Sequence, residues 1–295
     1  MLLLQAPAHM RYEAPESLEG AVALLAGATG EARVLAGGTD LLVQMRADIV
    51  DPELIVDIKK IAETRAVTEE QGGWRIGAAV TGAELKEHTR LKQAWPGVVE
   101  AANLIGSTQV QGRATLGGNL CNGSPAADSV PALIAAGAVA TVAGPQGKRD
   151  LPVEDVMLGP RKLALRKGEI VVSFLLPPRP PRSSDAYLRF IPRTEMDIAV
   201  VGAGVSVTIG GAGTIIAARV SLGAVAARVL LVPEAAQAIV GSRLDAAAQQ
   251  RLEAAARAAC RPIDDKRGTT EFRIDVAGVL TRRAALIALD RARAN

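Results

Sequence analysis

The chain has 295 residues, of which 49% are hydrophobic and only 2% aromatic, so it is long enough for two ordinary domains whose cores are built from Ala, Val, Leu and Ile. Its net charge of +3, from 34 basic and 31 acidic residues, is scattered along the sequence, which argues against the concentrated basic face of a nucleic-acid-binding protein. No stretch approaches about 18 uninterrupted apolar residues and the amino terminus makes a poor signal peptide, so we expect no membrane span and a cytoplasmic location.

Strands and short helices are predicted to alternate in the first part of the chain, which indicates an α+β or α/β unit. Strands are expected at residues 34–35, 53–61, 73–80, 139–144 and 169–177. Helices are expected at residues 17–27, after the Gly-Gly pair at 37–38, from residue 81, at 97–106, and from about residue 128. Ser17, Thr81 and either Thr39 or Asp40 are the candidate N-caps.

A segment rich in Pro and Ser, residues 177–187, marks the predicted domain boundary. Beyond it, two long strands flank the turn "GGAG" at residues 210–213, and helices are expected at 244–260 and 276–294. The second unit therefore reads as a smaller α+β domain, an antiparallel sheet with helices on one face. We place the two domains at residues 1–177 and 185–295.

Two Gly-Gly turns carry the clearest chemical signal. In "VLAGGTDLL" (34–42) a strand ends in Gly37–Gly38 and a helix follows. "ATLGGNLCNGSPAADSV" (114–130) lies between two apolar stretches where a strand and a helix are expected, and it contains a second Gly-Gly pair, Gly117 and Gly118. Bare backbone N–H groups beside a helix N-terminus bind phosphate, and the absence of a Cβ permits close approach. Two such turns suggest that a diphosphate or dinucleotide is bound from two sides.

Each of these features also has a structural interpretation. A Gly-Gly turn before a helix is usually a tight connection without a ligand. Asp128 either accepts a hydrogen bond from a sugar hydroxyl or caps the following helix. Asn119 either binds the ligand through its amide or occupies a left-handed turn position.

Other sites are disfavoured by the residues present. Neither turn has the Lys and Ser/Thr of a P-loop, and "GAGVSV" (202–207) has Val207 at the third glycine of a dinucleotide-binding fingerprint. His9 and His88 have no triad motif around them and are interpreted as surface or packing residues. Cys121 and Cys260 form no CxxC or Cys/His cluster, so we expect no bound metal.

Four segments resemble one protein family, the FAD-binding or medium subunits of the molybdenum hydroxylases, which include xanthine dehydrogenase and carbon monoxide dehydrogenase. The resemblance is carried by "VLAGGTDLLVQMR" (34–46), "ATLGGNLCNGSPAADSVPALIAAGA" (114–138), "YLRFIPRTEMDIAVVGAGVSV" (187–207) and "RPIDDKRGTTEFR" (261–273). It runs from about residue 10 to the C-terminus, with the paired motifs in the order typical of the family.

The resemblance implies a vanillyl-alcohol-oxidase (PCMH)-type domain, in which FAD lies between two α+β subdomains, followed by the C-terminal flavoprotein domain. The positions that match the family's cofactor-binding residues are Ala36, Gly37, Gly38, Thr39, Asp40, Leu41, Thr115, Gly117, Gly118, Asn119, Asp128, Leu176 and Arg193. No catalytic residue is expected on this chain, because the redox chemistry belongs to the cofactor.

The implied function is electron transfer. A large molybdopterin-binding subunit would oxidise the substrate, a small subunit with [2Fe–2S] clusters would pass the electrons on, and FAD on this chain would deliver them to an external acceptor. The resemblance implies a heterotrimer or its dimer. The alternatives are a free-standing flavin-dependent reductase or oxidase of the same fold, and a nucleotide-binding module without redox chemistry.

Overall fold

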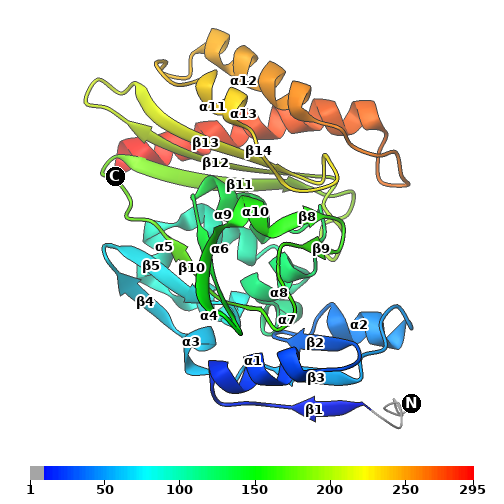
Figure 1. The fold of residues 1–295 in the computed structure, drawn as a ribbon. Coiled ribbons are helices and arrows are strands. Elements are labelled where there is room, and N and C mark those ends of the chain that lie inside the picture. Colours follow the sequence, from blue (N-terminus) through cyan, green and yellow to red (C-terminus); the bar gives the residue numbers. More distant parts are fainter. Residues whose placement is uncertain (1–9) are drawn as a thin grey trace.

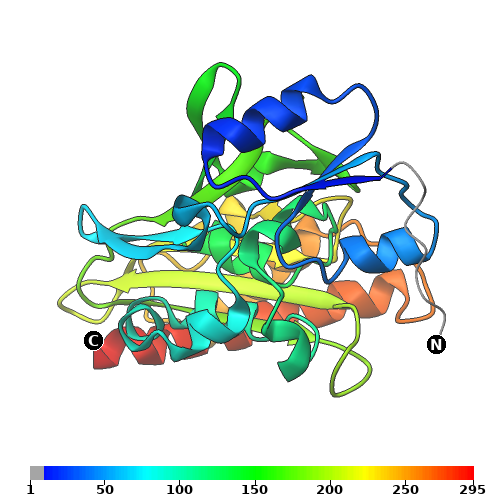
Figure 2. The ribbon, with the colours of Figure 1, turned by 90° about the horizontal axis from the view of Figure 1, so that it is seen from below.

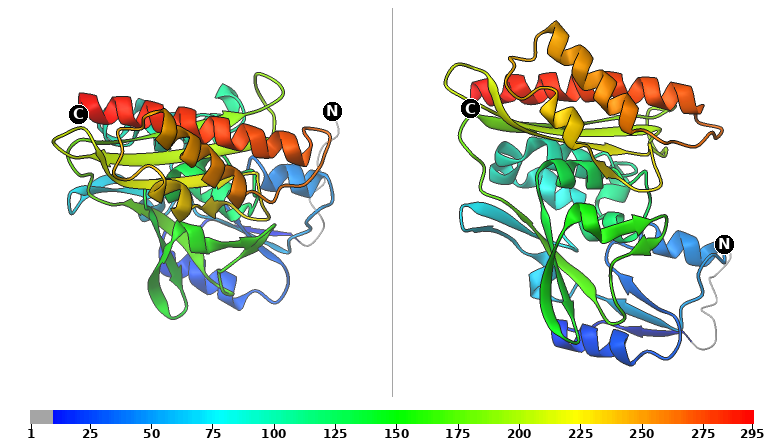
Figure 3. Two further views of the ribbon diagram at one scale, coloured as in Figure 1. Left: turned by 90° about the horizontal axis from the view of Figure 1, so that it is seen from above. Right: turned by 45° about the horizontal axis from the view of Figure 1, so that its top comes forward.

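The computed structural model describes residues 10–295, which are arranged in three layers (Figure 1). A three-stranded sheet with two helices forms the lower layer, a five-stranded sheet with short helices forms the middle layer, and a four-stranded sheet covered by three helices forms the upper layer. The same order is visible in the tilted view of Figure 3. None of the helices between residues 10 and 295 combines the length and hydropathy required of a transmembrane span.

The lower layer is a parallel sheet with the strand order β1-β3-β2. Its elements are β1 (Arg11–Glu13), α1 (Leu18–Gly27), β2 (Ala32–Leu35), α2 (Leu41–Arg46) and β3 (Leu54–Asp57). Helix α1 begins as predicted, because the Ser17 side chain accepts a hydrogen bond from Gly20 N. It buries Leu18 and Leu25 and lies beside the β6–β7 hairpin of the middle layer (Figure 2).

The middle layer is an antiparallel sheet with the order β4-β5-β10-β6-β7. Its strands, with a separate small hairpin, are β4 (Val67–Glu70), β5 (Gly73–Gly77), β6 (Val139–Gly144), β7 (Gly147–Pro152), β8 (Met157–Gly159), β9 (Lys162–Leu163) and β10 (Ile170–Leu176). Its helices are α3 (Ala62–Arg65), α4 (Gly82–Glu87), α5 (Thr89–Ala94), α6 (Pro96–Ala102), α7 (Thr108–Gln111), α8 (Leu116–Cys121), α9 (Ser129–Ala135) and α10 (Val153–Val156).

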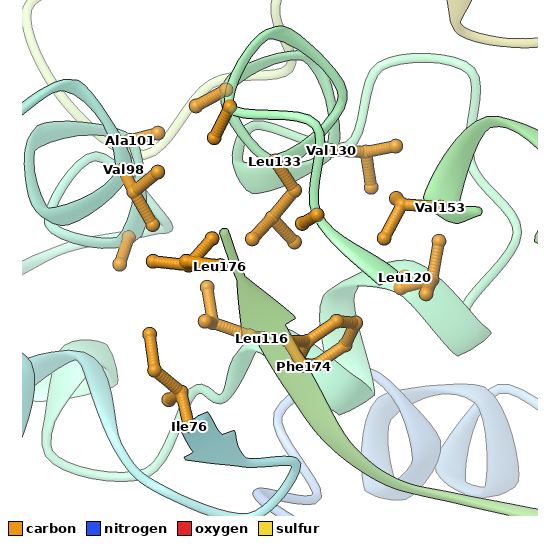
Figure 4. Packing of buried hydrophobic residues seen from close by; sticks show 14 of the residues in the cluster. Ile76, Val98, Ala101, Leu116, Leu120, Val130, Leu133, Val153, Phe174 and Leu176 are labelled. Atoms are coloured by element: carbon orange, nitrogen blue, oxygen red, sulfur yellow. The ribbon is translucent and has the colours of Figure 1, made fainter. Parts of the chain in front are cut away.

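The core of the middle layer fixes helix α8. Leu116 and Leu120 of α8 are buried beside Phe174 and Leu176 of β10 and Leu133 of α9 (Figure 4). Burying a leucine side chain contributes roughly 1.5–3 kcal/mol. The residues between these two leucines, 117–119, are therefore held in place by the packing on either side of them.

The upper layer is an antiparallel sheet with the order β11-β12-β13-β14. Its elements are β11 (Ser183–Phe190), β12 (Val201–Ile209), β13 (Ile215–Gly223), β14 (Leu230–Leu231), α11 (Pro233–Gln237), α12 (Ala246–Ala259) and α13 (Thr270–Ala294). The three helices cover one face, as predicted, and α6 and α9 of the middle layer pack against the other. The contact is close, because a Cβ at Gly204 would come within 2.5 Å of Pro131 O.

The segment predicted as a boundary is held firmly between the middle and upper layers. Arg179 pairs with the buried Asp185 (Nη2 to Oδ1, 2.9 Å) and lies over the Trp95 ring, 4.2 Å from its centroid. Asp185 Oδ2 in turn accepts a hydrogen bond from Val98 N, in the first turn of α6 (3.2 Å). Residues 177–182 are thus held to the middle layer through Trp95 and to the upper layer through Asp185.

Several predicted elements differ from those observed. Most important, the element directly before the second Gly-Gly pair is the helix α7 and not the expected strand. Gly117 and Gly118 themselves lie inside α8, whose N-cap is Thr115. The helix expected at 97–106 ends at Ala102. His88 caps α5 through Nδ1, which accepts from Leu91 N (3.2 Å), as a packing residue would. His9 lies outside the described residues.

Candidate functional site

A cleft of about 390 Å³ lies between the lower and middle layers, and both glycine turns line it. The first glycine turn, residues 36–41, follows β2; the second glycine turn, residues 115–119, begins α8. Ten of the predicted site residues contribute to the lining: Ala36, Gly37, Gly38, Thr39, Asp40, Leu41, Thr115, Gly117, Gly118 and Asn119. The structure therefore brings together two segments about 80 residues apart in the sequence.

The first glycine turn has unpaired backbone donors at the cleft lining. Within residues 10–295, none of the N–H groups from 36 to 41 donates a hydrogen bond to a protein group. Gly38 has a φ of 81°, a left-handed conformation that favours glycine. Lys59 Nζ donates to Ala36 O (3.1 Å) and to Asp57 Oδ2 (2.7 Å), which holds that carbonyl in place. Successive N–H groups in such a turn form an anion-binding concavity.

The carboxyl group of Asp40 shares this part of the cleft. Asp40 as a whole is exposed to solvent, but its carboxyl group is partly desolvated by the cleft walls, and this desolvation raises the pKa of Asp40. At the N-cap position of α2 it makes no side-chain capping bond. Of the two predicted N-cap candidates, Thr39 and Asp40, Asp40 therefore occupies the position but does not cap the helix with its side chain.

The second glycine turn uses its backbone donors internally. Gly117 N donates to Ala78 O, Gly118 N to Thr115 Oγ1, and Asn119 N to Thr115 O, each at 3.0 Å. The two glycines therefore differ in what surrounds them. A Cβ at Gly117 would come within 2.6 Å of Ala78 O, whereas a Cβ at Gly118 would meet only Thr115 Oγ1, at 3.0 Å. Of the two positions, only Gly118 has room for a side-chain atom.

Aliphatic side chains make up most of the rest of the lining, together with Arg33, Gln44, Cys121, Asn122, Arg161 and Glu169. Among residues 10–295, no Phe, Tyr or Trp belongs to the lining, which reflects the low aromatic content of the chain. The apolar lining residues with side chains larger than Ala are Val34, Leu41, Ile49, Val50, Ile58, Ile105, Leu163, Leu165, Ile170 and Val171. Arg161, at the tip of the β8–β9 hairpin, adds a positive charge.

One hydrogen bond links the two walls of the cleft. Gln44 Nε2 of α2 donates to Asn122 Oδ1, immediately after α8 (2.8 Å). Both residues line the cleft. This bond joins the lower layer to the middle layer beside the two glycine turns.

Three predicted site residues lie outside the cleft lining. Asp128 is buried in an ion pair with Arg189 (2.8 Å) and accepts from Tyr187 (3.3 Å). Leu176 is fully buried in the core of the middle layer (Figure 4). Arg193 is exposed in the loop after β11 and pairs with Asp197 (3.1 Å). The assignment of these three residues to a cofactor stays a prediction.

Comparison with known families identifies the chain. The model of the "FAD binding domain in molybdopterin dehydrogenase" matches residues 8–179, more than half of the chain. The chain belongs to the FAD-binding subunits of the molybdenum hydroxylases. The "CO dehydrogenase flavoprotein C-terminal domain" matches residues 186–288 of this FAD-binding subunit, which confirms the resemblance seen in the sequence.

Individual relatives agree with the family. The subunit is 33% identical to the carbon monoxide dehydrogenase medium chain of Afipia carboxidovorans over 97% of this chain and 99% of that one. It is 30% identical to the xanthine dehydrogenase FAD-binding subunit of Escherichia coli O157:H7, covering 92% and 93% of the two chains. A solved carbon monoxide dehydrogenase from Oligotropha carboxidovorans superposes with a TM-score of 0.92 at 34% identity, covering 97% of this chain and 99% of that one. This subunit is thus an FAD-binding component of an oxidoreductase.

Sequence reasoning missed part of the cleft of this FAD-binding subunit. Gln44 lies within the first family motif and Asn122 within the second, but nothing in a single sequence pairs them. Ile170 and Val171 lie in the predicted strand at 169–177, whereas the prediction chose Leu176, at the far end of that strand. Arg161 was missed because a lone arginine in a hairpin turn has no motif; its φ of 58° is visible only in the structure.

Proposed function

We propose that this chain is the electron-transfer subunit of a multi-subunit molybdenum hydroxylase, with FAD bound in the cleft between the lower and middle layers. The observation that carries the proposal is the meeting of both glycine turns in one cleft. The unpaired N–H groups of residues 36–41 provide donors for a diphosphate without any lysine. Hydrogen bonds to a charged group contribute roughly 1.5–3 kcal/mol each, so a few of them hold the diphosphate firmly.

The two turns divide the binding between them in this proposal. The first glycine turn supplies backbone donors, and the second supplies the bare face of Gly118 and the side-chain amide of Asn119. The aliphatic walls, including Ile170 and Val171, pack against the flat ring and exclude water. When bound, FAD supplies the electron-carrying chemistry, and this chain positions it.

The proposed partners are a large molybdopterin-binding subunit and a small subunit with [2Fe–2S] clusters, in a heterotrimer or its dimer in the cytoplasm. The name "medium chain" of the relatives supports such an assembly. So do two apolar side chains of α2 beside the cleft: Leu42 and Val43 are 51% and 63% exposed. Such exposed apolar groups are typical of surfaces that a partner covers. The electrons would leave FAD for an external acceptor.

Purification of the chain alone and with its genomic neighbours tests the proposal. We expect a yellow protein with bound FAD that co-purifies with a molybdenum-containing subunit and is reduced by that subunit's substrate. A colourless protein that takes up no FAD would contradict the cofactor site. A yellow monomer that reduces its own substrate without partners would instead support the free-standing reductase.

A further inference from the structure

Helix α9 is capped by a residue of the second glycine turn. Asp128 occupies the N-cap position but has αR geometry and makes no capping bond. Arg189 Nη1 (2.8 Å) and Tyr187 Oη (3.3 Å) donate to its carboxylate instead. The capping acceptor is Asn119 Oδ1, which receives hydrogen bonds from Ser129 N (3.0 Å) and Ser129 Oγ (2.7 Å).

The bond from Ser129 N determines which way the Asn119 amide points, and the Ser129 hydroxyl adds a second bond to the same oxygen. A backbone N–H only donates, so the atom of Asn119 that faces Ser129 N must be the carbonyl oxygen. The Nδ2 group then lies on the other side of the amide; within residues 10–295 it has no hydrogen-bond partner, and it is not fully buried. Since Asn119 lines the cleft, the side-chain group that it can offer to a ligand there is the amide donor and not the carbonyl oxygen, which is bonded to Ser129.

We propose that Ser129 is a positioning residue for the cofactor: its hydroxyl locks Asn119 so that the Nδ2 donor faces the FAD diphosphate. This inference rests on the proposed function, which places the diphosphate between the two glycine turns. A diphosphate has only acceptors at its oxygens, so a donor at this position attracts it and a carbonyl oxygen repels it. Ser129 itself is fully buried and lies outside the cleft lining, so its hydroxyl acts through Asn119.

The test is a titration of FAD into the full-length apoprotein, in which flavin fluorescence measures the dissociation constant. We expect Asn119→Ala to weaken FAD binding on the order of ten- to a hundredfold, since it removes a donor to a charged group. Ser129→Ala should weaken it about three- to tenfold, the effect of one neutral hydrogen bond. ADP, which carries the diphosphate without the flavin ring, should lose affinity by the same factors. Ser124→Ala is the matched control, because that hydroxyl accepts from Ala126 N (3.2 Å) and does not contact Asn119.

A double-mutant cycle separates positioning from general loosening. If Ser129 acts through Asn119, Ser129→Ala has no further effect on FAD affinity in the Asn119→Ala background. If Ser129→Ala weakens FAD binding as much in the Asn119→Ala background as in the wild type, the positioning role is overturned. The proposed function would still stand in that case, provided that the wild-type chain binds FAD. A wild-type chain without affinity for FAD would instead overturn the proposed function itself.

Asn119→Asp gives an independent check that does not depend on removing the cap. Its carboxylate still accepts from Ser129, so α9 stays capped and the thermal stability of the apoprotein is kept. The group facing the cleft becomes an anion, and FAD should bind more weakly than to Asn119→Ala. Binding equal to or tighter than that of Asn119→Ala would show that no donor faces the diphosphate.

Discussion

Gly37 lies directly against the backbone carbonyl of Arg113, so that a Cβ at Gly37 would come within 2.0 Å of Arg113 O. Arg113 comes two residues before the second glycine turn, and Gly37 belongs to the first. This contact therefore sets the distance between the two turns. Glycine is required at position 37 by the packing of protein against protein, and not by the approach of a ligand.

Gly37→Ala should lower stability and FAD content together. The added methyl group meets backbone atoms that cannot rotate away, and overpacking of this kind costs about 1–3 kcal/mol. The melting temperature of the apoprotein and the flavin-to-protein ratio measure the two effects. Gly211→Ala is the control, because nothing lies within 4 Å of a Cβ at Gly211. A Gly37→Ala protein that matches this control in both measurements would refute the packing argument.

The two glycines of the second turn should respond differently to substitution. Gly117→Ala places a methyl group 2.6 Å from Ala78 O and should lower the melting temperature of the apoprotein. Gly118→Val projects its side chain where only Thr115 Oγ1 is near, so the fold survives but the cleft is narrowed. We expect Gly118→Val to lose FAD with little change in apoprotein stability. Equal losses of stability in both variants would contradict this division.

Much of the fold follows from local sequence signals. Ser17 caps α1 and Thr81 caps α4 through a capping box with Glu84, as their sequence positions indicate. The hairpin around residues 210–213 follows from alternation of apolar residues on either side of a glycine turn. These features depend on residues close together in the chain, which is why a single sequence reveals them.

The rest depends on contacts between distant residues. The sequence suggested that Asp128 either caps α9 or binds a sugar hydroxyl. In the structure, Arg189 and Tyr187 of the upper layer donate hydrogen bonds to its carboxylate instead. Asn119 then caps α9 in its place. The glycine pair at 117–118 lies in a helix because the leucines on either side of it, Leu116 and Leu120, are buried in the core. Local sequence propensities therefore could not predict the partners of Asp128, the cap of α9 or the helical conformation of the glycine pair.

The hydrogen bond between Gln44 and Asn122 should slow the release of FAD. It joins the two walls of the cleft (2.8 Å), so the walls separate more easily once it is removed. We expect Gln44→Ala to raise the FAD dissociation rate about three- to tenfold, the effect of one hydrogen bond. Stopped-flow flavin fluorescence measures the rate. Gln249→Ala, which also removes one partly buried hydrogen bond but in the upper layer, should leave it unchanged.

The buried Asp128 should make stability depend on pH in mildly acidic solution. Burial, which outweighs the opposing effect of Arg189, raises the pKa of Asp128 from 3.8 to about 6. The folded state therefore binds a proton that the unfolded state has already released between these two pH values. The stabilising contribution of this protonation is complete below about pH 4 and is lost as the pH rises through about 6.

Urea unfolding of the wild-type apoprotein and of Asp128→Asn between pH 4 and 7 tests this linkage. Asn keeps the shape of the side chain but does not titrate, and Tyr187 stays protonated because its pKa is raised well above its ordinary value. The free energy of unfolding of the wild type minus that of the variant should therefore fall as the pH rises from 4 to 6 and then level off. A difference that stays constant or grows over this range would mean that Arg189 keeps Asp128 ionised throughout.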